Sequence, residues 1–242
     1  MKLWQKLFPD HRPATPYCSA LIAAAGSSQR MAGENKLLLP LGGRSVLAHT
    51  LQAVDAAAGV NEIVIAAREE DLVKFAELCK LWGIQKPVKI IVGGKTREES
   101  VLRAAIEANE NADLLAVQDG ARPFVTPELI DSVIEAARVH FAAAPAIPVK
   151  DTVKVAVDGV VRETPDRSLL YAVQTPQVFD AQLLRAALKS AVDAGAVLTD
   201  DCSAVERLGK EIYLIAGLEE NIKITTPLDM ILAEAILAKR ES

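Results

Sequence analysis

The segment at residues 23–40, AAAGSSQRMAGENKLLLP, combines small residues with two cations. Residues 24–26 carry little or no side chain, so successive backbone N–H groups can approach a bound phosphate closely. Arg30 and Lys36 add positive charge to the same loop, and a polyphosphate needs both hydrogen-bond donors and countercharge. The whole string indicates a polyphosphate site, although the glycine alone would favour a solvated strand-to-helix turn.

Other common catalytic motifs are missing from the chain. Gly93-Gly94-Lys95-Thr96 resembles the end of a P-loop, but that motif requires a glycine at position 89, which is a lysine here. The sequence has no G-x-G-x-x-G, H-E-x-x-H or G-x-S-x-G pattern, and its three histidines are isolated. These absences weaken the kinase, dinucleotide-dependent dehydrogenase, zinc hydrolase and α/β-hydrolase interpretations.

Strand and helix patterns alternate over the first 141 residues. Buried-strand patterns occur at 18–26, 62–67, 88–94 and 113–120, and helical patterns at 45–57, 71–82, 97–109 and 126–141. Thr126 and Pro127 suit a helix N-cap followed by proline at the first helical position. The alternation predicts an α/β fold around a mainly parallel sheet.

The polar loops after Ala25, Val92 and Gln118 all follow predicted strands. Open α/β sheets bind ligands at the carboxyl ends of their strands, particularly where the strand order reverses. We therefore expect the functional site to lie where these three loops meet.

The pattern changes at residues 151–167, DTVKVAVDGVVRETPDR. Apolar and polar residues alternate around Asp158-Gly159, which is a strong signal for a two-residue hairpin. A lone hairpin is only marginally stable in water, so we expect this one to project as an arm and pack on a second subunit. The α/β pattern then resumes at 181–195, 201–209, 211–217 and 227–240.

Length and composition exclude several classes of protein. The chain has 242 residues, 50% of them hydrophobic, which predicts one large domain at 17–242 preceded by an appendage at 1–16. The uncharged stretch 141–149 is far shorter than the roughly 20 residues of a membrane span, so we expect no membrane partner. The net charge of −5 argues against a nucleic-acid partner. Three widely spaced cysteines without a C-x-x-C pair suggest neither disulfides nor zinc, and the cytoplasm is the expected compartment.

The loop at 23–40 is similar to that of the nucleotidyltransferases that activate sugars and alditols, and further motifs narrow this resemblance. They are DGARP (119–123), DTVK (151–154), TPQ (175–177), TDD (199–201) and NIKIT (221–225), in this order. Together they resemble the 2-C-methyl-D-erythritol 4-phosphate cytidylyltransferase family of the non-mevalonate isoprenoid pathway. The resemblance covers roughly residues 17–240, and it implies a Rossmann-like nucleotidyltransferase core with a hairpin arm for dimerisation.

The resemblance also implies a role for each matching residue. The nucleotide, CTP, would be bound through its phosphates and its base by Ala24, Ala25, Gly26, Ser27, Ser28, Gly93, Gly94 and Ser100. The catalytic set would be Arg30, Lys36, Asp119 and Lys223, with Lys223 at the α-phosphate. The acceptor, a polyol phosphate, would be held by Arg122, Thr152, Arg167, Thr175 and Thr199. Of these, Thr152 and Arg167 lie in the arm and would serve the site of the neighbouring subunit in a homodimer.

These roles are consistent with the chemistry of the reaction. An anionic acceptor phosphate must attack an anionic α-phosphorus, so several cations have to collect both groups. No strong general base is needed, because a phosphate monoester is largely ionised near neutral pH, with a second pKa of about 6. A divalent ion, Mg²⁺, is expected on the triphosphate oxygens, and the chain offers no dedicated carboxylate cage for it.

Several of these residues also have purely structural interpretations. Asp119 can cap its loop, Lys223 can be an exposed strand-end lysine, and Thr175 can be a restricted turn residue before a proline. The aspartates at 200 and 201 resemble a metal pair, but capping of the following helix is the favoured interpretation. For Lys95 and Arg97 the interpretation is simple exposure to solvent.

One residue departs from the family pattern, and two other functions compete. Ser28 occupies a position that is glycine in many relatives, which puts the detailed geometry of the loop in doubt more than its role. One competing function is a cytidylyltransferase for another alditol phosphate, such as ribitol 5-phosphate, which would differ only in the acceptor pocket. The other is a nucleotide-binding regulatory protein without catalysis, against which the presence of the four predicted catalytic residues argues.

Overall fold

The computed structural model describes residues 15–26 and 35–241, with the last of these described in its backbone only. Most of the predicted appendage at 1–16 lies outside this range. The same is true of three predicted phosphate-loop residues, Ser27, Ser28 and Arg30, so their roles stay predictions.

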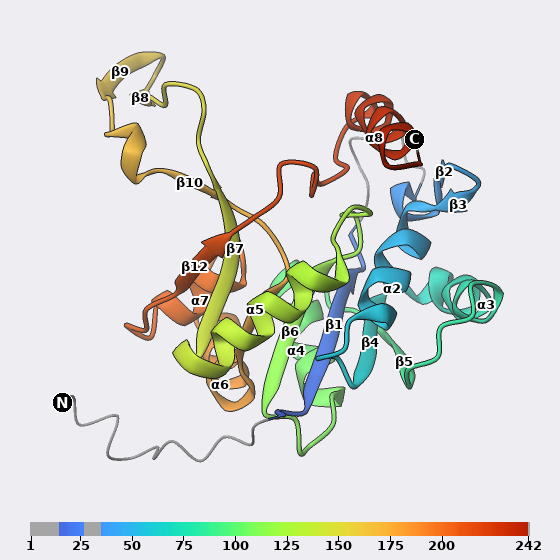
Figure 1. Cartoon of the computed structure of the whole chain (residues 1–242). Coiled ribbons are helices and arrows are strands. Elements are labelled where there is room, and N and C mark those ends of the chain that lie inside the picture. Colours follow the sequence, from blue (N-terminus) through green and yellow to red (C-terminus); the bar gives the residue numbers. More distant parts are fainter. Residues whose placement is uncertain (1–14, 27–34, 242) are drawn as a thin grey trace.

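An eight-stranded mixed sheet forms the centre of the molecule (Figure 1). One half is parallel and consists of β1 (Cys18–Ala24), β4 (Glu62–Ala67), β5 (Val88–Val92) and β6 (Leu114–Asp119). The other half consists of β7 (Ala142–Pro148), β10 (Tyr171–Val173), β11 (Gln177–Asp180) and β12 (Tyr213–Ala216). In that half β11 runs antiparallel between β6 and β7, whereas β12 pairs with β7 in parallel. The expected α/β fold with a mainly parallel central sheet is confirmed.

Helices cover both faces of the sheet, so its central strands are buried on both sides. One face carries α2 (Val46–Ala56), α3 (Leu72–Leu81) and α5 (Pro127–His140), and the other carries α4 (Arg97–Glu107), α6 (Ala181–Asp193) and α7 (Asp201–Glu206). Along β1 the alternation is direct, since Ile22 packs in the first core and Leu21 in the second. Figure 1 shows α5 crossing in front of the sheet and α4 behind it.

The C-terminal helix α8 (Pro227–Glu241) lies outside these two layers. It packs on a small third core that includes Leu41 of the short strand β2 (Pro40–Leu41), Phe124 and Ile224. The short strand β3 (Arg44–Ser45) pairs with β2, and short 3-10 turns lie at Lys36–Leu38, Glu69–Asp71 and Arg167–Leu169. This third core holds the NIKIT segment beside the sheet.

The strand order places a switch point between β1 and β6. The sheet runs β6-β1-β4-β5, so the chain proceeds from β1 to β4 and β5 and then returns to the opposite side of β1. Ala23 of β1 and Asp119 of β6 lie opposite each other at this junction. Ligand sites form in such crevices, so two of the three expected loops meet there.

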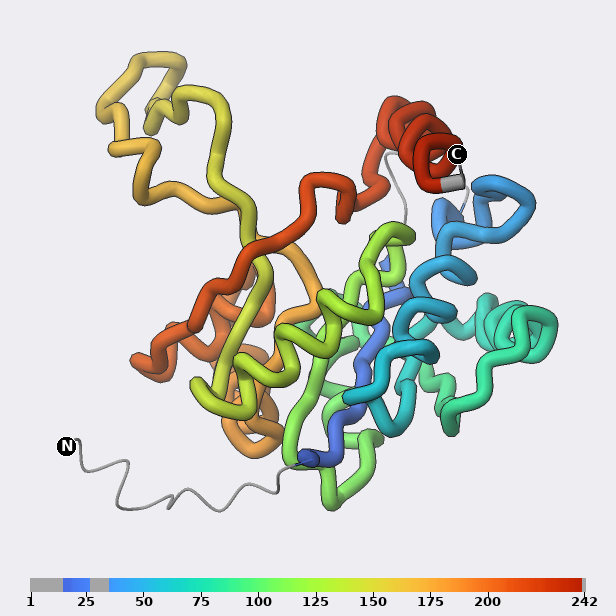
Figure 2. The backbone as a smooth tube through the Cα atoms, viewed as in Figure 1, coloured from blue at the N-terminus to red at the C-terminus, as the bar shows by residue number. Residues whose placement is uncertain are grey.

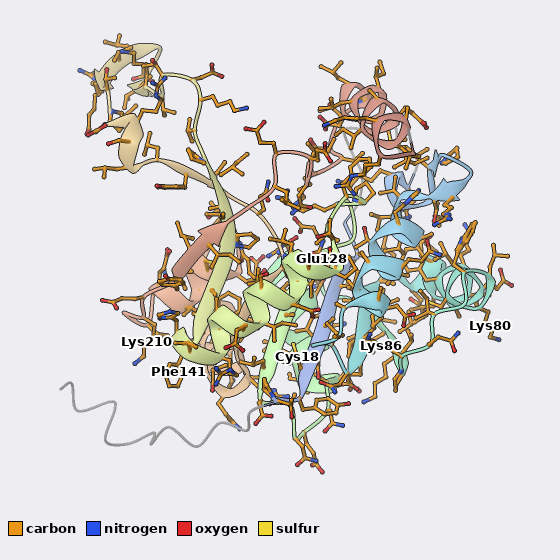
Figure 3. The ribbon with its side chains drawn as sticks, viewed as in Figure 1. Cys18, Lys80, Lys86, Glu128, Phe141 and Lys210 are labelled. Atoms are coloured by element: carbon orange, nitrogen blue, oxygen red, sulfur yellow. The ribbon has the colours of Figure 1, made fainter. Side chains whose placement is uncertain are left out.

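The hairpin at 151–167 is confirmed as a projecting arm (Figure 2). Its strands β8 (Val155–Val157) and β9 (Val160–Glu163) pair with each other, and Asp158 and Gly159 both have positive φ, at 52° and 77°. Two successive positive φ angles are what a tight two-residue hairpin turn requires. The valine side chains of both strands are exposed, and Figure 3 shows the arm standing apart from the body of the protein.

Two further observations concern membrane-spanning helices and the cysteines. Among the described residues, no helix combines the length and the apolar character that crossing a membrane would require. Cys18, which Figure 3 labels at the start of β1, Cys79 and Cys202 are all buried free thiols. Burial raises the pKa of all three thiols, in the case of Cys79 to about 11, so they belong to the core rather than to reactive sites.

Candidate active site

Two cavities adjoin at the carboxyl ends of β1 and β6. The larger, of about 340 Å³, is lined by Ala23, Ala24, Ala25, Gly26, Lys36, Leu37, Gly94, Lys95, Thr96, Arg97, Ser100, Asp119, Ala121 and Lys223. The smaller, of about 110 Å³, is lined by Arg97, Asp119, Arg122, Val173, Gln174, Thr175, Gln177, Thr199, Asp200 and Lys223. Arg97, Asp119 and Lys223 line both cavities and therefore mark the junction between them.

Small residues at and just after the end of β1, residues 23–26, line the larger cavity. Lys36 approaches the same cavity from a 3-10 turn that Asn35 caps through its side-chain oxygen. The Asn35 amide also donates to the buried Asp71 carboxylate, which in turn accepts from Arg68. This network fixes Asn35 at the start of the turn that carries Lys36.

Glycine is required at Gly93 because three elements meet there at very short range. A Cβ atom at Gly93 would lie 2.6 Å from the Ala25 Cβ atom and 2.9 Å from the Ser100 hydroxyl oxygen. Ser100 in turn accepts from the Gly94 N–H at 3.0 Å and donates to the Thr96 carbonyl at 2.7 Å. Gly94 and Ser100 line the larger cavity, whereas Gly93 is packed against Ala25 and Ser100 and is not among the lining residues.

Asp119 is the central charged group of the site. It is 5% exposed, and its carboxylate lies 2.9 Å from the Lys223 ammonium, 3.3 Å from Arg122 Nε and 3.6 Å from Arg97 Nη2. Burial would raise the pKa of Asp119, but Lys223, Arg97 and Arg122 outweigh it and lower the pKa to about 2. The carboxylate is thus ionised and draws three cations to the junction of the cavities.

Lys223 is held in place by its own segment. The backbone N–H of Ile224 donates to the Ala121 carbonyl at 2.8 Å, which ties NIKIT to the DGARP loop. Asn221 donates to the Thr175 carbonyl at 3.0 Å, and its own carbonyl accepts from Arg122 Nη1 at 2.7 Å. These contacts explain how motifs far apart in the sequence converge on one carboxylate.

The smaller cavity contains three of the predicted acceptor residues. Thr175 accepts from the Asp119 backbone N–H at 3.1 Å and is buried, whereas Thr199 is exposed at the rim. The largest influence on Arg122 is burial, which lowers the pKa of its guanidinium from the ordinary value. Gln174 and Gln177 also line the smaller cavity, although glutamine next to a Thr-Pro turn carries no chemical signal of its own in the sequence.

The interpretation of Arg97 as a solvated residue is wrong. Its side chain is 33% exposed and its Nη2 atom lies 2.7 Å from the carboxylate of Asp201, 104 positions away in the chain. The prediction that Asp200 and Asp201 cap the following helix is correct for Asp200 only. Asp200 caps α7 through Ser203, but the Asp201 side chain is buried against Arg97 and does not cap the helix.

The remaining predicted residues, Thr152 and Arg167, do not line either cavity of their own chain. Both are exposed on the arm, where Arg167 Nη1 donates to the Lys150 carbonyl at 2.7 Å. Their predicted role requires a second subunit.

Known proteins resemble this chain over almost its entire length. A sequence model of the family described as 2-C-methyl-D-erythritol 4-phosphate cytidylyltransferase matches residues 18–239. A protein of that name from Bacillus thuringiensis (strain Al Hakam) is 44% identical over 218 residues, which cover 90% of this chain and 96% of that protein. Its counterpart from Halalkalibacterium halodurans is 43% identical over 224 residues, covering 92% and 98% of the two chains.

Solved structures show the same relationship. The 4-diphosphocytidyl-2C-methyl-D-erythritol synthase of Anaerococcus prevotii matches with a TM-score of 0.84 and 32% identity, covering 93% of this chain and 97% of that one. The 2-C-methyl-D-erythritol 4-phosphate cytidylyltransferase of Thermus thermophilus matches with a TM-score of 0.72 and 34% identity, covering 90% and 98%. The chain therefore belongs to the 2-C-methyl-D-erythritol 4-phosphate cytidylyltransferase family.

Proposed function

We propose that this protein transfers CMP from CTP to 2-C-methyl-D-erythritol 4-phosphate, giving 4-diphosphocytidyl-2-C-methyl-D-erythritol and pyrophosphate. Family membership supports the reaction. The observation that carries it is the pair of adjoining cavities whose shared wall consists of Arg97, Asp119 and Lys223. A two-substrate transfer needs two sites that open onto one reacting centre, and this wall supplies that centre.

CTP would occupy the larger cavity. Its phosphates would lie along the small residues at the end of β1, with Arg30 and Lys36 as counterions, and its base would lie against Gly94 and Ser100. The proposal is supported by the cavity lining, which includes Lys36, Gly94 and Ser100, and by the close packing of Gly93 against two of the lining residues.

The acceptor would occupy the smaller cavity with Arg122, Thr175 and Thr199. Its phosphate oxygen would form a bond to the α-phosphorus of CTP, while the bond from that phosphorus to the bridging oxygen breaks and its electron pair leaves with pyrophosphate. Lys223 at the shared wall would neutralise charge that builds up on the α-phosphate. The acceptor phosphate needs no base, so the protein's work would be positioning and charge stabilisation.

The residues at the junction are a poor fit for a protein-held metal ion. Asp119 is the one carboxylate among the described residues lining the larger cavity, and three cations already surround it. The described residues contain no cluster of three or more His, Cys, Asp or Glu side chains suited to a metal. We therefore propose that Mg²⁺ would be held through the CTP phosphates, where it would supply further charge neutralisation.

The arm would make the protein a homodimer. The side chains of Val155, Val157, Val160 and Val161 are 44%, 50%, 55% and 54% exposed. A two-stranded hairpin with its apolar side chains in water is only marginally stable by itself. A partner subunit would cover them, and Thr152 and Arg167 would then reach the acceptor phosphate in the partner's smaller cavity.

The cytoplasm is the proposed compartment. All three cysteines are free and buried, and a reducing environment keeps such thiols unpaired.

Release of pyrophosphate from CTP and Mg²⁺ tests the proposed reaction. It should depend on 2-C-methyl-D-erythritol 4-phosphate, and the cytidylyl product should appear in equal amount. Release with ribitol 5-phosphate but not with the erythritol phosphate would keep the chemistry and reassign the acceptor. Binding of CTP without turnover with either acceptor would instead favour a regulatory protein.

A further inference from the structure

A partly buried ion pair, Arg97 with Asp201, reaches the shared wall of the two cavities but lies outside the set of residues predicted to bind substrates. Asp201 is 1% exposed, and its Oδ2 atom accepts from Arg97 Nη2 at 2.7 Å. Its other oxygen, Oδ1, has no hydrogen-bond partner among the described residues. Burying such a pair costs desolvation energy that its attraction often fails to recover, so stability alone explains its presence poorly.

The position of Arg97 in its helix is also electrostatically unfavourable. It is the first residue of α4, directly after the Thr96 cap, where the partial charge of the helix end is positive. Burial would lower the pKa of the Arg97 guanidinium, but the carboxylates of Asp201 and Asp119 outweigh it and raise the pKa. Burial raises the pKa of Asp201, and the contact with Arg97 opposes this shift. The arginine is therefore held at this place by the two carboxylates rather than by its helix.

One nitrogen of Arg97 faces both carboxylates. Nη2 lies 2.7 Å from Asp201 Oδ2 and 3.6 Å from Asp119 Oδ1. The other oxygen of Asp119, Oδ2, faces Lys223 at 2.9 Å and Arg122 at 3.3 Å. Arg97 thus faces Asp119 Oδ1, whereas Lys223 and Arg122 contact Oδ2. Contacts to both oxygens restrict rotation of the Asp119 side chain.

Asp201 is itself anchored to the central sheet. Gln177 of β11 accepts from the backbone N–H groups of Asp201 and Cys202, each at 3.0 Å, and donates to Asp200 at 2.8 Å. The start of α7 is therefore fixed by a side chain of the strand next to β6. A continuous chain of contacts runs from Gln177 through Asp201 and Arg97 to Asp119.

We infer that Arg97 and Asp201 are positioning residues, which hold the Asp119 carboxylate and through it the Lys223 ammonium at the junction of the two cavities. The inference deepens the proposed cytidylyl transfer and rests on it. Displacement of Asp119 would move Lys223 away from the α-phosphate, whereas the other contacts to CTP would remain. Loss of the pair should therefore reduce kcat far more than CTP binding.

Four variants test this inference by acceptor-dependent turnover and CTP titration calorimetry. Arg97→Met should lower kcat about 10- to 100-fold, as expected for a misplaced reacting group, with a CTP Kd within about threefold of wild type. Arg97→Lys should recover part of this loss, because an ammonium can still face both carboxylates. Asp201→Asn keeps the shape of the side chain, removes its charge and should also lower kcat. The matched control is Arg185→Met, which removes an arginine that donates to the Ala105 and Asn109 carbonyls away from both cavities and should leave kcat unchanged.

The double variant separates positioning from general damage. If Arg97 and Asp201 act as one unit, Arg97→Met with Asp201→Asn should be no more than about threefold worse in kcat than Arg97→Met alone. Fully additive losses, a loss of CTP binding equal to the loss of kcat, or an equally inactive Arg185→Met would overturn the inference.

Crystal structures keep this test independent of the acceptor. In Arg97→Met the distance from Lys223 Nζ to Asp119 Oδ2 should open beyond about 4 Å, the limit of a close ion pair, and in wild type it should stay closed. An unchanged distance in the variant would refute the positioning role even if wild type proved inactive with the erythritol phosphate, an outcome that would refute the proposed reaction separately.

Discussion

The ammonium of Lys36 donates to the main-chain carbonyl of Ile224 at 2.8 Å, although 188 positions separate the two residues. The contact joins the end of the predicted phosphate loop to the segment that carries Lys223. Both predicted phosphate-binding lysines are thereby held on one wall of the larger cavity. In the proposed mechanism, the charge that meets the triphosphate and the charge that meets the α-phosphate would therefore lie side by side.

Replacement of Lys36 by alanine should lower kcat/KM for CTP about 100- to 1,000-fold, because a preorganised charge facing the triphosphate is lost. Lys36→Arg should retain more activity than Lys36→Ala, since it keeps the charge. Steady-state kinetics with varied CTP checks both. Full turnover by Lys36→Ala would contradict the proposed mechanism.

Asp119→Asn should reduce stability in a pH-dependent way. The pKa of Asp119 is about 2 in the folded protein against an ordinary value of 3.8, so its contribution is present above pH 4 and disappears as the pH falls towards 2. The free energy of unfolding should drop by on the order of 2 kcal/mol at pH 7, and the difference from wild type should shrink below pH 4.

Urea unfolding between pH 7 and pH 3 measures this difference. The control is Glu135→Gln, which breaks an exposed ion pair with Arg138 and should change stability by less than about 1 kcal/mol. A difference for Asp119→Asn that stays constant down to pH 3 would show that the carboxylate is not held ionised by its neighbours.

Gly93→Ala should weaken CTP binding about tenfold and lower stability by about 1–3 kcal/mol, because the added carbon forces a well-packed wall apart. The new Cβ atom would clash with Ala25 and Ser100, which both line the larger cavity. Calorimetric titration with CTP and thermal unfolding provide the two measurements. Unaltered CTP affinity would mean that this wall does not contact the nucleotide.

Arg167→Ala should leave CTP binding intact but raise the KM for the acceptor, because the arm carries no part of the larger cavity. If the arm serves the partner's site, mixed dimers of Arg167→Ala and Lys36→Ala chains contain one complete site. An equal mixture that exchanges subunits should then recover about a quarter of wild-type activity. No recovery in dimers shown to be mixed by native mass spectrometry would place the arm at its own chain's site.

Local signals in the sequence determined much of the fold. Apolar periodicity predicted the four strands of the parallel half and the helices between them, and Asp158-Gly159 predicted the arm, because turn geometry depends on only two residues. The strand β7 was not predicted. It contains Pro145 and Pro148, which read locally as strand breakers, and pairing with its neighbours β10, β11 and β12 overrides that preference.

In the candidate site, too, some residues were predicted from the sequence and others were found only in the tertiary structure. The motifs that resemble the family predicted Lys36, Asp119 and Lys223 as site residues, and all three line the larger cavity. Arg97 and Asp201 could not be assigned in this way, because a charged residue after a helix cap is ordinarily solvated. Only the folding of α4 and α7 onto the same face of the sheet brings the two side chains to 2.7 Å, buries the carboxylate and places the arginine between both cavities.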